Sequence, residues 1–218
     1  GYSLFLSASV SGFAIGGCVN DGNGTASGHV RIYQYNNNSW SQLGADIDGE
    51  ALGDYSGASV SLSSDGSRLA IGAIANDGGG NNSGHVRIYQ YNNNSWSQLG
   101  ADIDGEDSGD ESGYSVSLSS DGSRLAIGGY LNDGNGTSSG HVRIYDYNGS
   151  ALVQVGDDMD GEAANNYSGW SVSLSPDGSR VAIGAYGNDG AQYSNKTDSG
   201  HVRIYEYSSG SWNQLGDD

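Results

Sequence analysis

The chain has 218 residues, of which 38 are glycine, and its formal net charge at pH 7 is −18. Its eight Lys and Arg residues form no basic patch, which argues against nucleic acid and anionic membranes as partners. No apolar run approaches the roughly 18 residues that a membrane-spanning helix needs, and a single cysteine, Cys18, excludes an internal disulfide framework.

The phrase Ser-Gly-His-Val-Arg-Ile-Tyr occurs four times and sets the register of the whole chain. Its histidines, His29, His85, His141 and His201, follow one another at intervals of 56, 56 and 60 residues. Self-similarity at a fixed period is typical of architectures in which each repeat is one supersecondary unit. We therefore expect a single repeat domain over residues 1–218, made of units at 1–56, 57–112, 113–168 and 169–218.

The second unit shows the expected elements in chain order. Residues 57–63 alternate small polar and apolar side chains, which indicates a half-buried strand. Asp65-Gly66 is a strong hairpin signal, and residues 68–73 follow it as the second strand. After a loop rich in Asn and Gly, residues 85–91 are predicted to form the third strand and residues 96–100 the fourth.

Four antiparallel strands joined by turns are the plan of a β-propeller blade. One blade exposes apolar surface on both faces, so stacking of blades explains why every unit repeats the same apolar positions. The predicted fold class is all-β, a β-propeller-type repeat of four-stranded antiparallel blades. The sequence leaves open whether the blades close a ring, belong to a larger propeller or stack as an open fibre. Two units deviate, since Ser9-Val10 replaces the Asp-Gly turn and the last unit carries extra residues within Gly187–Ser199.

Three segments of the third unit carry a family resemblance, namely Gly113–Leu118, Asp121–Gly128 and Ser139–Tyr145. Together they resemble the FG-GAP repeat, which builds the propeller of integrin alpha subunits and of many secreted microbial and algal proteins. Residues 175–182 also resemble the second hairpin of WD-type blades. The resemblance implies propeller blades and leaves function open, because such blades host adhesion, scaffolding and enzymes alike. The integrin calcium loop is not matched, since residues 64–67 contain one carboxylate.

Acidic loops join each unit to the next and place alternating carboxylates around a glycine. Such a loop can surround a hard cation with oxygen ligands, which makes calcium the candidate cofactor. Solvated turns with Asx-type hydrogen bonds explain the same residues and are the alternative. The four histidines each open a strand, so we assign them an architectural role. The candidate calcium ligands are Asp46, Asp48, Glu50, Asp102, Asp104 and Glu106.

Eight Asn-x-Ser/Thr sequons fall in predicted loops, and the loop before each repeated phrase contains one. Loops rich in Asn and Ser generate some sequons by chance. The number and placement of these sequons favour covalent N-glycans and therefore an extracellular glycoprotein. The candidate acceptors are Asn23, Asn37, Asn81, Asn93, Asn135, Asn148, Asn166 and Asn195.

No nucleophile–base pair or phosphate-binding loop is visible in the sequence, so we predict that the protein is not an enzyme. Near-identical repeats, with residues 27–50 and 83–106 identical over 24 positions, favour a structural or adhesive building block of a cell surface, appendage or fibre. Self-association, head to tail or side by side, is the expected interaction. The first alternative is a lectin-like propeller, and the second is an enzyme with its site in a central channel. The candidate glycan contacts are Tyr55, Tyr114, Tyr167 and Trp170.

Overall fold

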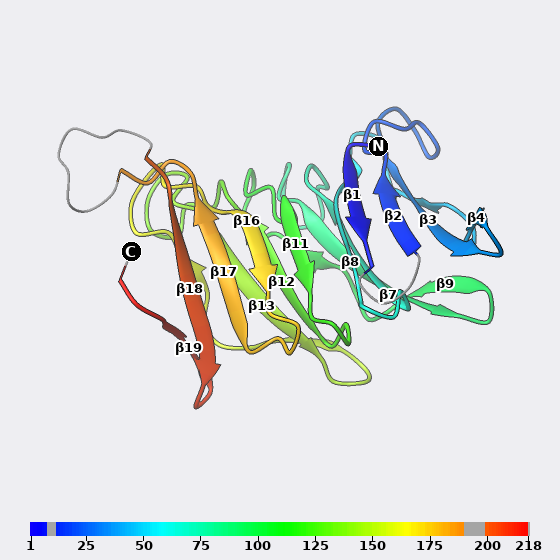
Figure 1. Ribbon diagram of the computed structural model, residues 1–218. Helices are drawn as coiled ribbons and strands as arrows, with labels where there is room; N and C mark the ends of the chain where they lie inside the picture. Colours follow the sequence, from blue (N-terminus) through cyan, green and yellow to red (C-terminus); the bar gives the residue numbers. More distant parts are fainter. Residues whose placement is uncertain (8–11, 190–198, 218) are drawn as a thin grey trace.

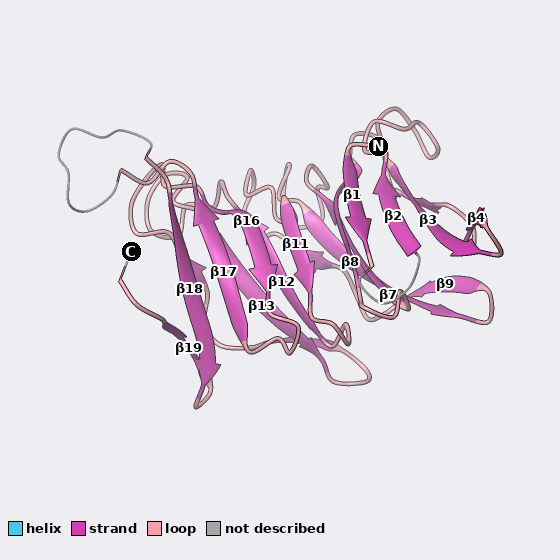
Figure 2. Ribbon diagram, viewed as in Figure 1, coloured by secondary structure: helices cyan, strands magenta, loops and turns pink. Residues whose placement is uncertain are grey.

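A computed structural model describes residues 1–7, 12–189 and 199–217 of the chain. These residues form an all-β structure of four sheets that follow one another in a row, with the two ends of the chain at opposite ends of the row (Figure 1). The turn at Ser9-Val10 and the sequon at Asn195 lie outside the described residues. Figure 2 shows strands and loops without a helix, so this part of the chain contains no helix that is long and apolar enough to cross a membrane.

Each sheet is built from strands that are neighbours in sequence and pair antiparallel. The first sheet contains β1 (Ser3–Leu6), β2 (Gly12–Gly16), β3 (His29–Asn36), β4 (Ser39–Gln42) and β5 (Ile47–Asp48). The second contains β6 (Ser56–Leu62), β7 (Arg68–Ala73), β8 (His85–Asn92), β9 (Ser95–Gln98) and β10 (Ile103–Asp104). The third contains β11 (Ser115–Leu118), β12 (Arg124–Gly129), β13 (His141–Tyr147), β14 (Leu152–Gln154) and β15 (Met159–Asp160). The fourth contains β16 (Ser168–Leu174), β17 (Arg180–Ala185), β18 (His201–Ser208) and β19 (Ser211–Gln214).

Four strands in each sheet agree with the predicted blade, and the predicted strands of the second unit coincide with β6 to β9 to within two residues. In the first two blades the hairpin between the third and fourth strands turns at an Asn pair, and Asn93 and Asn94 adopt φ values of 51° and 63°. Two left-handed residues in succession give the type I′ turn that matches strand twist. The two-residue strands β5, β10 and β15 pair with the start of the third strand, where the sequence predicted only an acidic loop.

The hydrophobic cores lie between neighbouring blades. Val30 and Ile32 of β3 pack against Leu69 and Ile71 of β7, and each of these four side chains is at most 1% exposed. Equivalent clusters join the second blade to the third and the third to the fourth. Because a blade contributes one face to each of two cores, its stability depends on its neighbours.

Adjacent blades approach to backbone contact near their first strands. A Cβ atom at Gly72 in β7 would collide with the carbonyl oxygen of Gly113, which begins the next blade. Ser59 Oγ donates to the same carbonyl over 2.6 Å. Only glycine leaves room for this contact. The arrangement recurs with Gly16, Ser3 and Gly57 at the first junction and with Gly128, Ser115 and Gly169 at the third.

Candidate functional site

A cluster of one histidine and three carboxylates lies at the junction of the first and second blades. His85 is the first residue of β8, and its side chain is 1% exposed. Its Nδ1 atom lies 3.9 Å from Glu50 Oε2, 3.9 Å from Asp102 Oδ2 and 4.0 Å from Asp104 Oδ1. The short strand β10 holds Asp104 opposite His85 in register, while Glu50 reaches over from the preceding blade.

The second oxygen of two of these carboxylates is held by a neighbouring side chain. Gln98 Nε2 donates to Asp102 Oδ1 over 2.6 Å. Arg87 Nη1 lies 3.5 Å from Glu50 Oε1, and its Nη2 donates to the carbonyl of Asp48 over 2.9 Å. One oxygen of Asp102 and one of Glu50 are thereby fixed, and the other oxygen of each faces the histidine ring.

The imidazole of His85 is buried without a hydrogen-bond partner among the described residues. Neither Nδ1 nor Nε2 makes a hydrogen bond. Burial, followed by the charge of Arg87, lowers the pKa of His85 below its usual value although three carboxylates oppose that shift. Its Nδ1 atom faces three carboxylate oxygens without a hydrogen bond to any of them.

The next junction repeats the cluster. His141 Nδ1 lies 3.8 Å from Glu106 Oε2 and 3.5 Å from Asp158 Oδ2. Gln154 Nε2 holds the other oxygen of Asp158 over 2.5 Å, and Arg143 Nη1 lies 3.6 Å from Glu106 Oε1. The proximity of His141 lowers the pKa of the Asp158 carboxyl, and burial opposes that shift.

The first blade has the same residues but a different arrangement. His29, Asp46 and Asp48 gather at the equivalent position. Among the described residues no preceding blade lies beside Arg31, and its guanidinium donates to both oxygens of Asp46 over 2.7–3.0 Å. In this blade, Asp46, which corresponds to Asp102, is therefore paired with Arg31.

The six predicted calcium ligands all lie at blade junctions, but those of one loop do not share one site. Asp46 and Asp48 remain beside His29, whereas Glu50 joins His85 in the next blade. Asp102, Asp104 and Glu106 divide in the same way. The histidines were predicted to be architectural, and the structure places them among these carboxylates. In the sequence, their membership of the clusters is indicated only by the recurrence of an acidic loop and a following histidine in successive units.

The sequons differ in accessibility. Six of the eight acceptor residues are exposed in the structure, which is what an attached glycan requires. Asn166 is 6% exposed, and its Oδ1 atom accepts hydrogen bonds from Ala163 and Asn188, so its surroundings oppose glycan attachment. The exposed acceptors are Asn23, Asn37, Asn81, Asn93, Asn135 and Asn148.

The outer faces of the two end blades expose apolar positions that interior blades bury. Val202 and Ile204 of β18 are 62% and 44% exposed. The strand at the other end, β1, exposes Leu4 and Leu6 at 71% and 67%. Within the described residues, these two apolar faces are not covered by a further blade, and each is of the kind that its interior counterparts use for stacking.

Aromatic side chains form a continuous cluster near the first strands of the last two blades. Trp170 packs on Tyr114 and Tyr130 with ring centroids 4.6 and 5.0 Å apart, and on Tyr186 at 4.5 Å. Tyr167 stacks on Tyr186 at 4.9 Å. Of the four predicted glycan contacts, the cluster contains Tyr114, Tyr167 and Trp170.

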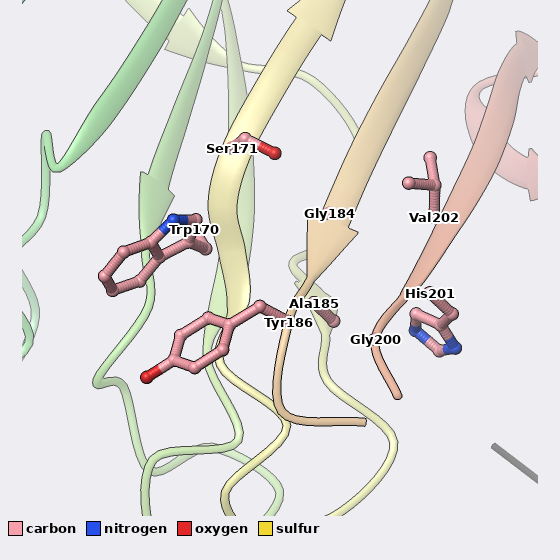
Figure 3. Close-up of a pocket in the computed structure, with 8 residues that line it drawn as sticks. All are labelled: Trp170, Ser171, Gly184, Ala185, Tyr186, Gly200, His201 and Val202. Atoms are coloured by element: carbon pink, nitrogen blue, oxygen red, sulfur yellow. The ribbon is translucent and has the colours of Figure 1, made fainter. Parts of the chain in front are cut away.

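Trp170 and Tyr186 also line a shallow cleft of about 350 Å³ on the outer face of the last blade. Figure 3 shows these two rings side by side, with His201 and Val202 of β18 across the cleft. The remaining lining residues are Ser171, Gly184, Ala185 and Gly200.

Comparison with known proteins supports the repeat assignment. Residues 159–205 match the family model of the FG-GAP repeat. The resemblance inferred from the third unit is thus confirmed for a segment that runs into the fourth, and the repeated four-stranded blades agree with a β-propeller-like repeat protein. No curated protein matches the chain.

Two similar solved structures are putative 6-phosphogluconolactonases from Bacteroides uniformis and Bacteroides fragilis. The first is 14% identical with a TM-score of 0.57, and the match covers 85% of this chain and 47% of that one. The second is 15% identical with a TM-score of 0.55, covering 86% of this chain and 47% of that one. The chain thus spans about half the length of both structures, and at this identity the likeness concerns the fold alone.

Proposed function

We propose that this chain is a non-catalytic structural repeat protein that associates end to end as a building block of an extracellular assembly. The outer face of the last blade carries the proposal, because it lacks a blade that its interior counterparts contact. The occupant that fits this face is the first blade of a second copy. Such a head-to-tail contact either closes into a ring or extends into a fibre.

A serine–glycine pair on the last blade, which at interior junctions contacts a glycine carbonyl of the next blade, supports a second copy as the partner. At interior junctions a Ser Oγ and a Gly together receive the carbonyl of a glycine that begins the next blade, as Ser59 and Gly72 receive Gly113. The equivalent pair in the last blade is Ser171 and Gly184, and among the described residues a Cβ at Gly184 would meet only Ser171. The repeat equivalent of Gly113 in the first blade is Gly1, which a second copy would supply.

The aromatic cleft supports the same occupant. At the junction of the last two blades, Trp170 sits on Tyr130 and on Tyr114. Tyr2 is the repeat equivalent of Trp170, and it is 69% exposed at the start of the chain. In a second copy, Tyr2 would occupy the cleft formed by Trp170 and Tyr186, which repeat Tyr114 and Tyr130.

An extracellular setting is proposed on two grounds. FG-GAP repeats are typical of extracellular proteins, and residues 159–205 match that family model. Six sequons are exposed on loops. Intact mass of the natively produced protein before and after enzymatic deglycosylation tests this part of the proposal, since an unchanged mass would remove the glycoprotein assignment.

Sedimentation velocity over a range of protein concentrations tests the end-to-end contact. We expect the sedimentation coefficient to rise with concentration in about 0.15 M salt, where screening weakens the repulsion between copies of charge −18. The variants Leu4→Glu and Ile204→Glu each place a charge on one of the end faces and should abolish this rise. Electron microscopy of the associated species then separates closed rings from fibres.

Leu52→Glu is the matched control, because Leu52 is 73% exposed but belongs to a loop away from the two end strands. It should associate like the unmodified chain. A chain that stays monomeric at high concentration, or equal loss of association in all three variants, would overturn the proposed contact.

A glycan-binding protein is the second candidate, and the exposed aromatic cleft is the observation that favours it. Trp170 is 37% and Tyr186 46% exposed, and aromatic ring faces of this kind pack on the apolar faces of sugars. A glycan array, used with two variants, distinguishes a lectin from an end-to-end building block. Binding that is lost in Trp170→Ala and retained in Ile204→Glu would favour the lectin over the building block.

A further inference from the structure

We propose that each interior blade junction with a complete cluster binds one divalent transition-metal ion of the zinc class. At the first junction the ligands are His85 Nδ1 and one carboxylate oxygen each of Glu50 and Asp102, and Asp104 lies beside them. At the second they are the equivalent His141, Glu106 and Asp158. The inference is independent of end-to-end association, because each cluster lies within one chain.

The buried imidazole is the observation that points to a ligand. A polar group without a hydrogen bond is costly to bury, and His85 is 1% exposed with both ring nitrogens unpartnered among the described residues. Its Nδ1 atom faces three carboxylate oxygens at 3.9–4.0 Å, too far for a hydrogen bond. A cation between the ring nitrogen and the oxygens of Glu50 and Asp102 would satisfy all three ligand atoms together.

The charges of the cluster call for a divalent cation. Glu50, Asp102 and Asp104 contribute three negative charges, and Arg87 beside Glu50 contributes one positive charge. The sum over these four side chains is two negative charges. Like charges crowded at one site repel one another unless a cation lies between them.

The surrounding residues orient the proposed ligands. Gln98 holds one oxygen of Asp102, and Arg87 lies against one oxygen of Glu50, which turns the remaining oxygens toward His85. Such outer contacts commonly fix the orientation of metal ligands. The second junction has the same supports in Gln154 and Arg143.

The nitrogen donor selects the class of ion. Calcium takes oxygen ligands, whereas imidazole with carboxylates suits zinc and its first-row neighbours. Two ligands bound to one zinc at tetrahedral angles lie roughly 3.4 Å apart. The separations of 3.5–4.0 Å between the histidine nitrogens and the carboxylates need only a small contraction to reach that value.

The first blade is expected not to bind the ion in this way. Arg31 donates to both oxygens of Asp46, the carboxylate equivalent to Asp102. Among the described residues no preceding blade supplies a counterpart of Glu50 there. The repeat thus contains its own internal control, in which the same residues are present and the site is incomplete.

Isothermal titration of zinc chloride into the chelator-treated chain tests the proposal. The described residues contain two complete clusters, so we expect at least two ions per chain. Asp102→Asn should lower the stoichiometry by one, and adding Asp158→Asn should lower it by one more. Glu50→Gln should abolish the same site as Asp102→Asn, because the site spans two blades. Cobalt(II) as a second probe should give visible d–d absorption that decreases with the same variants.

Asp46→Asn is the matched control and should keep both sites. Far-ultraviolet circular dichroism of every variant verifies that the fold is retained, and each substitution keeps the size of the side chain. Absence of zinc binding to the folded chain, equal loss in Asp46→Asn, or displacement of zinc by calcium at similar concentration would overturn the inference.

Discussion

An interior blade junction and the outer face of the last blade are built from identical residues with opposite exposure. Ile88 is 1% exposed where the third blade covers it, whereas Ile204, at the same repeat position, is 44% exposed. Val86 and Val202 differ in the same way, at 0% and 62%. Burial at these positions is therefore decided by the neighbouring blade, while the local sequence is the same.

At the other end of the row, the equivalent arginines Arg87 and Arg31 differ in their partners in the same way. Arg87 crosses the junction to Glu50 and to the carbonyl of Asp48, whereas Arg31 folds back onto Asp46 in its own blade. One repeat position thus has two partners, depending on whether a blade precedes it. Because Arg87 reaches the preceding blade and does not pair with Asp102, this carboxylate can face His85.

The largest effect is expected from Gly72→Ala. A Cβ atom at this position would collide with the backbone carbonyl of Gly113, which cannot move without separating two blades. We expect a loss of unfolding free energy of about 4 kcal/mol or more, since overpacking typically costs about 1–3 kcal/mol and occasionally more, and the clash here is with backbone. Urea unfolding followed by tryptophan fluorescence measures the loss.

Gly184→Ala is the matched variant on the outer face. Its new methyl group would meet Ser171 Oγ, just as that at Gly72 would meet Ser59 Oγ, but among the described residues no carbonyl of another blade lies against it. The unfolding free energy of the monomer should change little, while end-to-end association should weaken. Equal destabilisation by the two variants would show that the interblade carbonyl is not the cause.

Deleting buried volume should give the next largest effect. Ile88→Ala removes a side chain that is 1% exposed in the core between two blades, and the expected loss is about 2–4 kcal/mol. Ile204→Ala should cost well under that, because its side chain is 44% exposed. Thermal and urea unfolding of the pair at low protein concentration provide the measurement. Similar losses would mean that another part of the chain covers Ile204 in solution.

A smaller effect is expected at the arginine position. Arg87→Gln removes a charged hydrogen bond to the Asp48 carbonyl that is largely buried, which corresponds to about 1.5–3 kcal/mol. Arg31→Gln removes an exposed ion pair and should leave stability nearly unchanged. Chemical unfolding at two salt concentrations distinguishes them, since only the exposed pair is strongly screened. A larger loss in Arg31→Gln would contradict the crossing role of the interior arginines.

Much of the fold follows from local pattern. Alternation and Asp-Gly turns predicted β6 and β7, and the fixed repeat extended that prediction to every blade. The strands β5, β10 and β15 were missed because two residues are too short for a period to show. They exist because the start of the third strand offers unpaired backbone groups, which is a property of the assembled sheet.

The junction clusters are less visible in the sequence. Glu50 and His85 belong to different blades, so their proximity depends on how blades stack. The acidic loop suggested one site for Asp46, Asp48 and Glu50, whereas the structure divides them between two junctions. Calcium at these loops and glycans at the sequons stay predictions.

The smallest effect concerns the hairpin turn of the last blade, where Asp177 is fully exposed. Hydrogen bonds from the Ser175 hydroxyl, then from the Ser179 amide and hydroxyl, lower the pKa of the Asp177 carboxyl to about 2. The unfolded value is about 3.9, so the carboxylate stabilises the turn above about pH 4, and this contribution is lost as pH falls through 2. At the interior turn, burial raises the pKa of Asp121 and hydrogen bonds outweigh it. Carboxyl carbon NMR shifts should therefore titrate near pH 2 for Asp177, and Ser175→Ala should raise that midpoint. A midpoint near 4 in the unmodified chain would mean that the turn is not closed by these bonds in solution.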